Sequence, residues 1–93
     1  PESFALHQNY PNPFNPTTSI KYDLPQDALV KISIYDIMGR NIKTLVSGSQ
    51  SAGYQSVRWD ATNNYGEPIS AGMYIYTIQA GNFRQTKKMV LLK

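Results

Sequence analysis

The sequence predicts an all-β fold of about seven short antiparallel strands. Three observations lead to this prediction: stretches in which apolar and polar side chains alternate, turn residues between these stretches, and no stretch with the period of a helix. The expected strands cover residues 4–10, 18–24, 29–36, 40–46, 55–60, 72–80 and 83–92. A chain of 93 residues suits one domain better than two, so residues 1–93 are expected to form a single domain.

Alternation is clearest in residues 18–24 and 29–36. The side chains expected to face the core there are Ile20, Tyr22, Leu24, Val30, Ile32 and Ile34. The side chains expected to face solvent are Ser19, Lys21, Asp23, Lys31, Ser33 and Tyr35. Strands with one apolar and one polar face are typical of antiparallel sheets that are open to water on one side.

The remaining strands and turns complete the expected fold. Residues 72–80 are apolar on both faces, which predicts a central strand covered at least in part on both sides. Sharp turns are expected at residues 36–39 and, as a two-residue hairpin loop, at residues 81–82. Loops are expected over residues 48–53 and 61–66. Two packed sheets accommodate such strands economically, so we expect an immunoglobulin-like antiparallel β-sandwich, with a small barrel as the alternative.

Residues 10–16 contain three prolines, which cannot donate hydrogen bonds to a sheet and which restrict the residue before each of them. We interpret this stretch as a proline-rich connector inside the domain. It is expected to be extended and polyproline-like, and to run along one sheet edge.

The residue types that catalysis needs are scarce. The chain has no cysteine, which excludes disulfides, thiolate zinc sites and cysteine nucleophiles. Its one histidine, His7, is expected at the surface, and its six carboxylates show no spacing typical of an acid–base pair. We therefore expect no enzyme activity, no cofactor and no metal. Residues 60–66 offer oxygen ligands followed by a glycine, for which a turn is favoured over a calcium loop.

The charge pattern also limits the class of partner. The formal charge is +3, and the basic residues are scattered, so we expect no nucleic-acid partner. No apolar run approaches the ~20 residues of a membrane-spanning helix. The sequence begins at Pro1 and shows no signal peptide, so we expect it to come from the C-terminal end of a larger exported protein.

Several short motifs follow one another along the chain. They are Asn-Tyr-Pro-Asn-Pro-Phe-Asn-Pro at residues 9–16, Ile-x-Tyr-x-Leu-Pro at 20–25, Ile-Tyr-Asp-x-x-Gly-Arg at 34–40, Trp-Asp at 59–60, Ser-Ala-Gly-Met-Tyr at 70–74 and the closing string at 86–93. In this combination the chain resembles the C-terminal sorting domain of the type IX (Por) secretion system. Residues 29–78 are also similar to the immunoglobulin-like domain of the flagellar hook-capping protein.

The resemblance implies a function without chemistry. Sorting domains of this kind occur in the Bacteroidota and related phyla, at the end of a precursor that reaches the periplasm before it crosses the outer membrane. The implied partners are the outer-membrane secretion machinery, a sortase-like peptidase and an N-terminal cargo in the same precursor. The implied location is the periplasm in transit, and then the cell surface or the extracellular space.

The resemblance also points to particular residues. The signal motif that it implies comprises Tyr10, Pro11, Asn12, Pro13, Phe14, Gly72, Tyr74, Lys87, Lys88, Met89, Val90 and Leu91. If the last strand lies at a sheet edge, its free backbone groups could pair with a receptor, so our hypothesis is that residues 87–93 form the recognition surface. The chain departs from the family pattern at Ala61, where glycine is common.

Three other functions fit parts of the sequence. A proline connector followed by a sandwich suits a structural linker in a multidomain extracellular hydrolase. Exposed aromatic residues suit a carbohydrate-binding accessory domain, for which the candidates are Tyr10, Tyr35, Tyr54 and Tyr65. A hook-cap assembly domain is disfavoured, because the Tyr-Pro-Asn-Pro string is foreign to that role.

Overall fold

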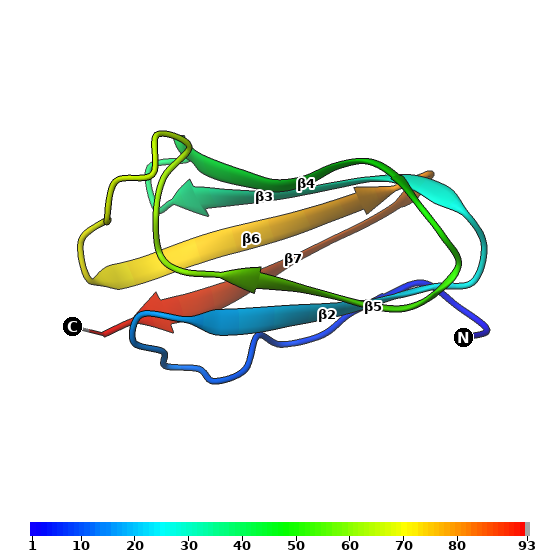
Figure 1. Cartoon of the computed structure of the whole chain (residues 1–93), viewed down its shortest axis with the longest axis horizontal. Helices are drawn as coiled ribbons and strands as arrows, with labels where there is room; N and C mark the ends of the chain where they lie inside the picture. Colours follow the sequence, from blue (N-terminus) through cyan, green and yellow to red (C-terminus); the bar gives the residue numbers. More distant parts are fainter. Residues whose placement is uncertain (93) are drawn as a thin grey trace.

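A computed structural model, which describes residues 1–92, contains seven strands in two antiparallel sheets (Figure 1). The strands are β1 (Ala5–Leu6), β2 (Thr18–Leu24), β3 (Ala28–Asp36), β4 (Asn41–Gln50), β5 (Gly53–Trp59), β6 (Gly72–Ala80) and β7 (Phe83–Leu91). The all-β, immunoglobulin-like sandwich expected from the sequence is therefore confirmed. The described residues include no helix that is long and apolar enough to cross a membrane.

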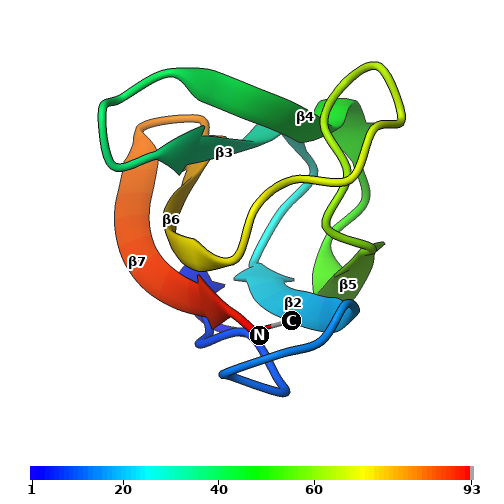
Figure 2. The ribbon, with the colours of Figure 1, turned by 90° about the vertical axis from the view of Figure 1, so that its left-hand side faces the viewer.

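The two sheets differ in size. One has three strands in the order β1-β2-β5, and the other has four in the order β4-β3-β6-β7. Figure 2, an end-on view, shows the larger sheet curving around the core, with β2 and β5 opposite it. The N-terminus and the end of β7 lie at opposite ends of the long axis (Figure 1), which measures 37 Å.

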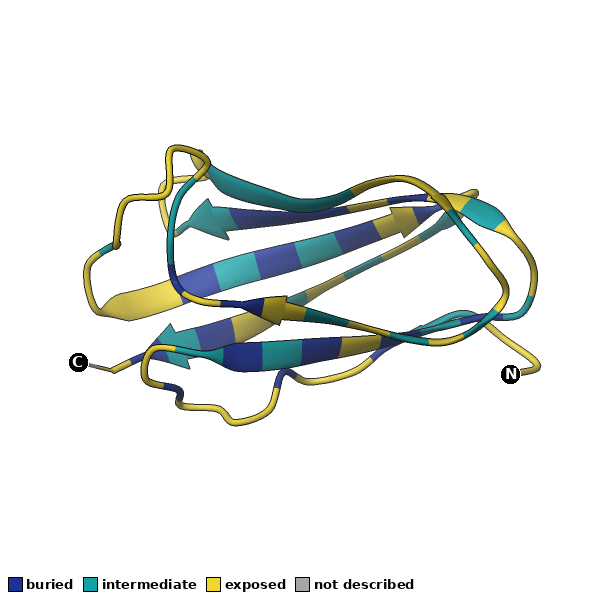
Figure 3. Ribbon diagram, in the orientation of Figure 1, coloured by how far each residue is buried: buried dark blue, intermediate teal, exposed yellow. Residues whose placement is uncertain are grey.

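The core lies between the sheets and follows the predicted alternation. All six side chains expected to face inward in β2 and β3 are at most 2% exposed. The largest side chains in the core are Trp59, Tyr22, Tyr76 and Phe14. Figure 3 shows buried and less buried positions alternating along β2 and β6, as expected for strands that cover one face of a core.

One expectation for the larger sheet was wrong. Ser33 was expected to face solvent but is only 3% exposed. β6 is central and partly covered on its outer face, as predicted, because Ile75 is half-buried there while Met73 is 46% exposed. The three-stranded sheet covers only the inner face of β6, so apolar residues on the outer face stay accessible to solvent.

The loop expected over residues 48–53 is mostly strand. β4 continues to Gln50 and pairs through Gly48 with Val30. Gly48 has a φ of 148°, which glycine adopts readily and other residues rarely do. The small residues therefore mark an unusual backbone conformation within a strand rather than its end.

The N-terminal region differs most from the prediction. The strand expected over residues 4–10 is regular only at Ala5–Leu6. Beyond it, the His7 N–H donates to the Lys21 carbonyl, and Tyr10 forms an isolated bridge with Ser19. The segment thus stays beside β2 up to Tyr10 and then leaves the three-stranded sheet.

Candidate recognition surface

The proline-rich connector crosses from one sheet to the other. Tyr10 exchanges two backbone hydrogen bonds of 2.9 Å with Ser19 on β2. Four residues later, the Phe14 N–H donates to the Val90 carbonyl (3.0 Å), and the Leu92 N–H donates to the Phe14 carbonyl (2.8 Å). The prediction of an extended connector along one edge was therefore wrong. The segment bends, its three X–Pro peptide bonds are cis, and it joins the edges of both sheets.

A buried polar cluster holds the start of the connector in place. The Asn9 N–H donates to the Tyr76 hydroxyl, and that hydroxyl donates to the His7 carbonyl, each at 2.8 Å. The Asn9 side-chain amide donates to the Thr18 hydroxyl at 3.0 Å. Asn9 is 2% exposed and Tyr76 is fully buried. The sequence did not predict this cluster, because no local pattern shows that a side chain of the central strand β6 hydrogen-bonds to the backbone of the N-terminal segment.

Burial raises the pKa of Tyr76 to about 12, and the hydrogen bond from the Asn9 N–H lowers it in part. We expect Tyr76→Phe to reduce the free energy of unfolding at pH 7 by about 1–3 kcal/mol, because two backbone groups lose their partner. The folded-state pKa lies above that of the unfolded chain, so the wild type should lose stability as pH rises from 10 to about 12. Tyr76→Phe should lose less folding stability than the wild type between pH 10 and about 12.

Denaturant unfolding at pH 7 and at several values between pH 9 and 12 measures both effects. Tyr22 and Tyr74 also have raised pKa values, because burial disfavours their charged forms, so a smaller alkaline loss should persist in the variant. An unchanged midpoint at pH 7, or an identical alkaline loss in both proteins, would contradict the proposed role of the hydroxyl.

Three aromatic rings gather where the connector meets β7. The Phe14 ring lies 5.8 Å from that of Trp59, which contacts the ring of Tyr74 edge-on at 6.2 Å. The Trp59 indole N–H donates to the Thr62 carbonyl at 2.9 Å, and the Tyr74 hydroxyl donates to the Ser70 carbonyl at 2.6 Å. Phe14 and Tyr74, both predicted signal residues, are therefore core residues and present almost no surface to a partner.

The backbone edge of β7 is only partly open. β7 is an edge strand, as the recognition hypothesis required. However, the Asn12 side-chain oxygen accepts from the Val90 N–H (3.0 Å), and the Gln8 amide donates to the Lys88 carbonyl (2.7 Å). Phe14 also forms backbone hydrogen bonds with Val90 and Leu92. The backbone groups on the outer edge of β7 are therefore paired with the N-terminal segment from Lys88 onward. The expectation of free backbone groups there was wrong, and Lys93 lies outside the described residues.

The open part of this edge lies closer to the start of the strand. Val90 directs its N–H and C=O away from β6, and alternation directs those of Thr86 and Arg84 the same way. Among residues 1–92, no hydrogen bond to another segment reaches these two backbone positions. A partner strand could therefore pair with β7 only before Lys88.

The predicted signal residues divide into accessible and inaccessible ones. Met89 and Leu91 are at most 1% exposed and belong to the core. Lys87 lies on the same inward-facing side of β7 and is half-buried, whereas Lys88 is exposed on the outer face. The accessible members of the set are Tyr10, Pro11, Asn12, Pro13, Gly72 and Lys88, and Val90 is half-buried.

Exposed apolar side chains collect at the end of the sandwich where β7 ends. Ile37 and Met38 lie in the turn after β3 and are 68% and 76% exposed. The Asp36 carboxylate accepts hydrogen bonds from the backbone N–H groups of Met38 and Arg40, which fixes the turn. Tyr65, Met73 and Leu92 are further exposed apolar residues at this end. The sequence predicted the turn but not the grouping.

The candidate catalytic and metal-binding groups, His7 and Asp60, are engaged in structural contacts. His7 lies 3.0 Å from Asp23 on the outer face of the three-stranded sheet, where His7 remains about half exposed. The Asp60 carboxylate accepts the Thr62 hydroxyl at 2.6 Å, a hydrogen bond that lowers the pKa of Asp60. Within residues 1–92, no three His, Cys, Asp or Glu side chains lie close enough together to hold a metal ion.

The loop from Asp60 is organised by its own side chains. The Asn63 side-chain oxygen accepts the backbone N–H groups of Tyr65 and Glu67 at 2.9 and 3.0 Å, an arrangement that builds a turn. Ala61 has a φ of 63°, a conformation that glycine adopts more readily, and it is buried. The departure from the family pattern at Ala61 therefore falls on a left-handed backbone position.

The two-sheet fold and the aromatic core define an immunoglobulin-like β-sandwich domain. Residues 12–83 match the family of the FlgD Ig-like domain. The match covers most of the chain, and the chain belongs to this family. Among curated protein sequences, none matches the chain.

Solved structures share the fold over almost the whole chain. A domain of dimeric latent PorU from Porphyromonas gingivalis superposes with a TM-score of 0.74 and 21% identity, covering 97% of this chain and 9% of PorU. PorZ from the same organism, an essential bacterial surface component of the type-IX secretion system, gives a TM-score of 0.63 and 17% identity over 99% of this chain and 12% of PorZ.

A third structure with this fold comes from a protein of a different kind. The alkylpurine DNA glycosylase AlkC from Pseudomonas fluorescens, bound to DNA with an abasic site analog, gives a TM-score of 0.52 and 16% identity over 97% of this chain and 30% of AlkC. The chain spans about a tenth of the length of PorU and PorZ. These likenesses establish the shared fold.

Proposed function

We propose that this domain is a non-catalytic sorting signal that directs an N-terminal cargo through the type IX secretion system. One observation carries the proposal: the connector and the last strand, which together contain ten of the twelve residues of the predicted signal motif, form a single hydrogen-bonded unit. Asn12 and Val90 are 78 positions apart and are joined directly. A signal read by one receptor requires such residues to lie together on the folded domain.

The geometry also indicates which part of this unit a receptor would contact. The backbone edge beyond Lys88 is occupied, and Phe14, Met89 and Leu91 are buried. We therefore assign recognition to the accessible outer surface of the unit, which comprises Lys88, Val90 and the exposed connector residues 10–13. The exposed apolar group at the same end of the sandwich adds contact area of the kind that protein interfaces use.

Similarity in fold to domains of PorU and PorZ supports a link to type IX secretion, because PorZ is a component of that system. In this proposal the outer-membrane machinery is the partner, and a sortase-like peptidase processes the precursor. The domain resides in the periplasm during transit and then reaches the cell surface or the medium. A cargo that precedes residue 1 would join at the end opposite β7's C-terminus, so it would not cover the proposed surface (Figure 1).

A secretion assay tests the proposal. A signal peptide and a fluorescent protein are placed before residues 1–93 in a host with a working type IX system, and a matched reporter lacks the domain. We expect fluorescence at the surface or in the medium only with the domain. Retention of both reporters in the periplasm, with the domain folded, would favour the linker or carbohydrate-binding alternatives instead.

A further inference from the structure

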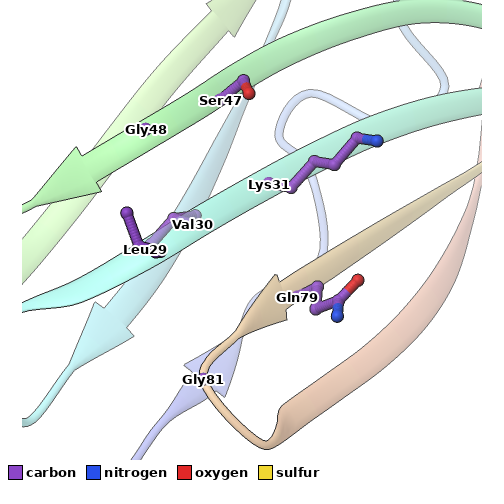
Figure 4. A pocket seen from close by; sticks show the side chains of 7 residues that line it. All are labelled: Leu29, Val30, Lys31, Ser47, Gly48, Gln79 and Gly81. Carbon is purple, nitrogen blue, oxygen red and sulfur yellow. The ribbon is translucent and has the colours of Figure 1, made fainter.

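The outer face of the four-stranded sheet carries two adjacent hollows, which lie apart from the connector. One has a volume of about 380 Å³ and is lined by Lys31, Tyr35, Thr77, Gln79, Arg84 and Thr86. The other, of about 470 Å³, lies beside Leu29, Gly48 and Gly81 and shares Lys31 and Gln79 with the first (Figure 4). Each volume falls within the ~300–1,000 Å³ typical of small-molecule sites.

Strand register places these side chains in rows across the sheet. Lys31 on β3 pairs with Gln79 on β6, which pairs with Arg84 on β7. In the next row on the same face, Thr77 pairs with Thr86, and their hydroxyl oxygens lie 3.0 Å apart. Consecutive rows on one face are spaced ~6–7 Å apart, so the two rows form one continuous polar floor.

The polar groups of this floor are mainly hydrogen-bond donors. The Gln79 side-chain oxygen accepts from the Arg84 guanidinium at 3.0 Å, so the Gln79 amide N–H groups are directed to other partners. Lys31 and Arg84 are exposed cations, and none of the described carboxylates lines either hollow. This face is therefore complementary to a ligand that carries negative charge and hydrogen-bonding oxygens.

The apolar parts of the hollows limit the ligand class further. Tyr35 is half-buried in the wall of the first hollow, and an aromatic ring of this kind can pack against the C–H face of a sugar. Leu29 is 71% exposed beside the second hollow. Gly48 and Gly81 carry no side chain, and an added Cβ at either would meet open space, so they leave room for a ligand.

We propose that the two hollows form a binding site for an acidic oligosaccharide, one whose sugar units carry carboxylate or sulfate groups. Lys31 and Arg84 pair with the anionic groups, the hydroxyl row and Gln79 bind sugar hydroxyls, and Tyr35 packs against one ring. A polyol accounts for the row of neutral hydroxyls better than an acidic peptide does. Arg84 and Thr86 lie on β7, but the site uses none of the residues assigned to receptor recognition, which are Lys88, Val90 and residues 10–13. Saccharide binding and export can therefore be tested separately.

Titration of the 93-residue domain with a galacturonate tetrasaccharide, followed by calorimetry and backbone NMR, tests the site. We expect binding at least tenfold tighter than for neutral maltotetraose, with the largest amide shifts on β3, β6 and β7 around Lys31, Gln79 and Arg84. Tetraglutamate is the third probe. Tetraglutamate binding as tight as that of the saccharide would overturn the assignment to a sugar, as would the absence of galacturonate binding.

Matched variants locate the site. Lys31→Gln with Arg84→Gln should weaken galacturonate binding at least tenfold, whereas Lys21→Gln with Arg58→Gln, which makes the same change in charge on the opposite sheet, should leave it within twofold. Tyr35→Ala should weaken binding at least fivefold. Thr86→Val, close to isosteric and on an edge strand, should weaken binding with the fold intact. The proposal would be overturned if the two double variants lost the same amount of galacturonate affinity. It would also be overturned if Thr86→Val and Tyr35→Ala both bound galacturonate as tightly as the wild type.

Discussion

Trp59→Ala is expected to destabilise the domain by about 3–5 kcal/mol, the usual cost of removing a large buried aromatic side chain. Trp59 is 1% exposed, and its ring contacts both Phe14 and Tyr74. A domain of this length has a total stability of about 5–14 kcal/mol. The variant should therefore be unfolded in part at 37 °C, with a melting temperature lower by on the order of 15 °C or more.

Thermal and urea unfolding, followed by circular dichroism, measure this loss. Trp59→Phe should retain part of the ring contacts and lose less, and Tyr54→Ala, on the same strand but 78% exposed, should change the free energy by less than about 0.5 kcal/mol. A loss below ~1 kcal/mol for Trp59→Ala would show that the aromatic group does not hold this end of the sandwich together.

Phe14→Ala is expected to cost a similar ~3–5 kcal/mol, although Phe14 belongs to no strand. The ring is 1% exposed and anchors the connector between Trp59 and the end of β7. Loss of this anchor should also release the backbone hydrogen bonds to Val90 and Leu92. Tyr10→Ala is the matched control in the same connector, because Tyr10 is 81% exposed and its side chain should contribute little.

Amide hydrogen exchange distinguishes local release from general destabilisation. The Leu92 amide donates to the Phe14 carbonyl, and the Val90 amide donates to the Asn12 side chain in the same connector. In Phe14→Ala, both amides should exchange faster by a larger factor than the Ile32 amide in the central strand β3. Acceleration by one common factor at all three positions would mean that the connector unfolds only together with the whole domain. Unchanged exchange at Val90 and Leu92 would contradict the connector–β7 unit.

The strands were predictable because their signal is local. In β2 and β3, alternation alone identified the inward-facing side chains, and all of them are buried. Ser33 was expected to face solvent and is instead buried, between Thr44 and Thr77 on the adjacent strands. Alternation indicates the face of the sheet but not how far neighbouring side chains cover a short one. The pairing of Gly48 with Val30 was also not predictable, since serine and glycine carry no hydrophobic pattern and backbone pairing decides their conformation.

The candidate site was predictable in its members but not in its geometry. The motif resemblance selected Asn12, Phe14 and Val90, and the structure joins them across the length of the chain. Sequence reasoning could not show that Asn12 and Phe14 occupy the very edge that was expected to be free. Such contacts depend on which sheet edges meet, and no local propensity encodes that.

The central claim is that the secretion machinery recognises the surface formed by Lys88, Val90 and connector residues 10–13. Lys88→Glu and Lys21→Glu make the same change in charge at exposed strand positions on opposite sheets. In the reporter assay, with both variants shown to be folded, we predict that Lys88→Glu lowers export at least tenfold and that Lys21→Glu leaves it unchanged. Equal export by the two variants would contradict the claim.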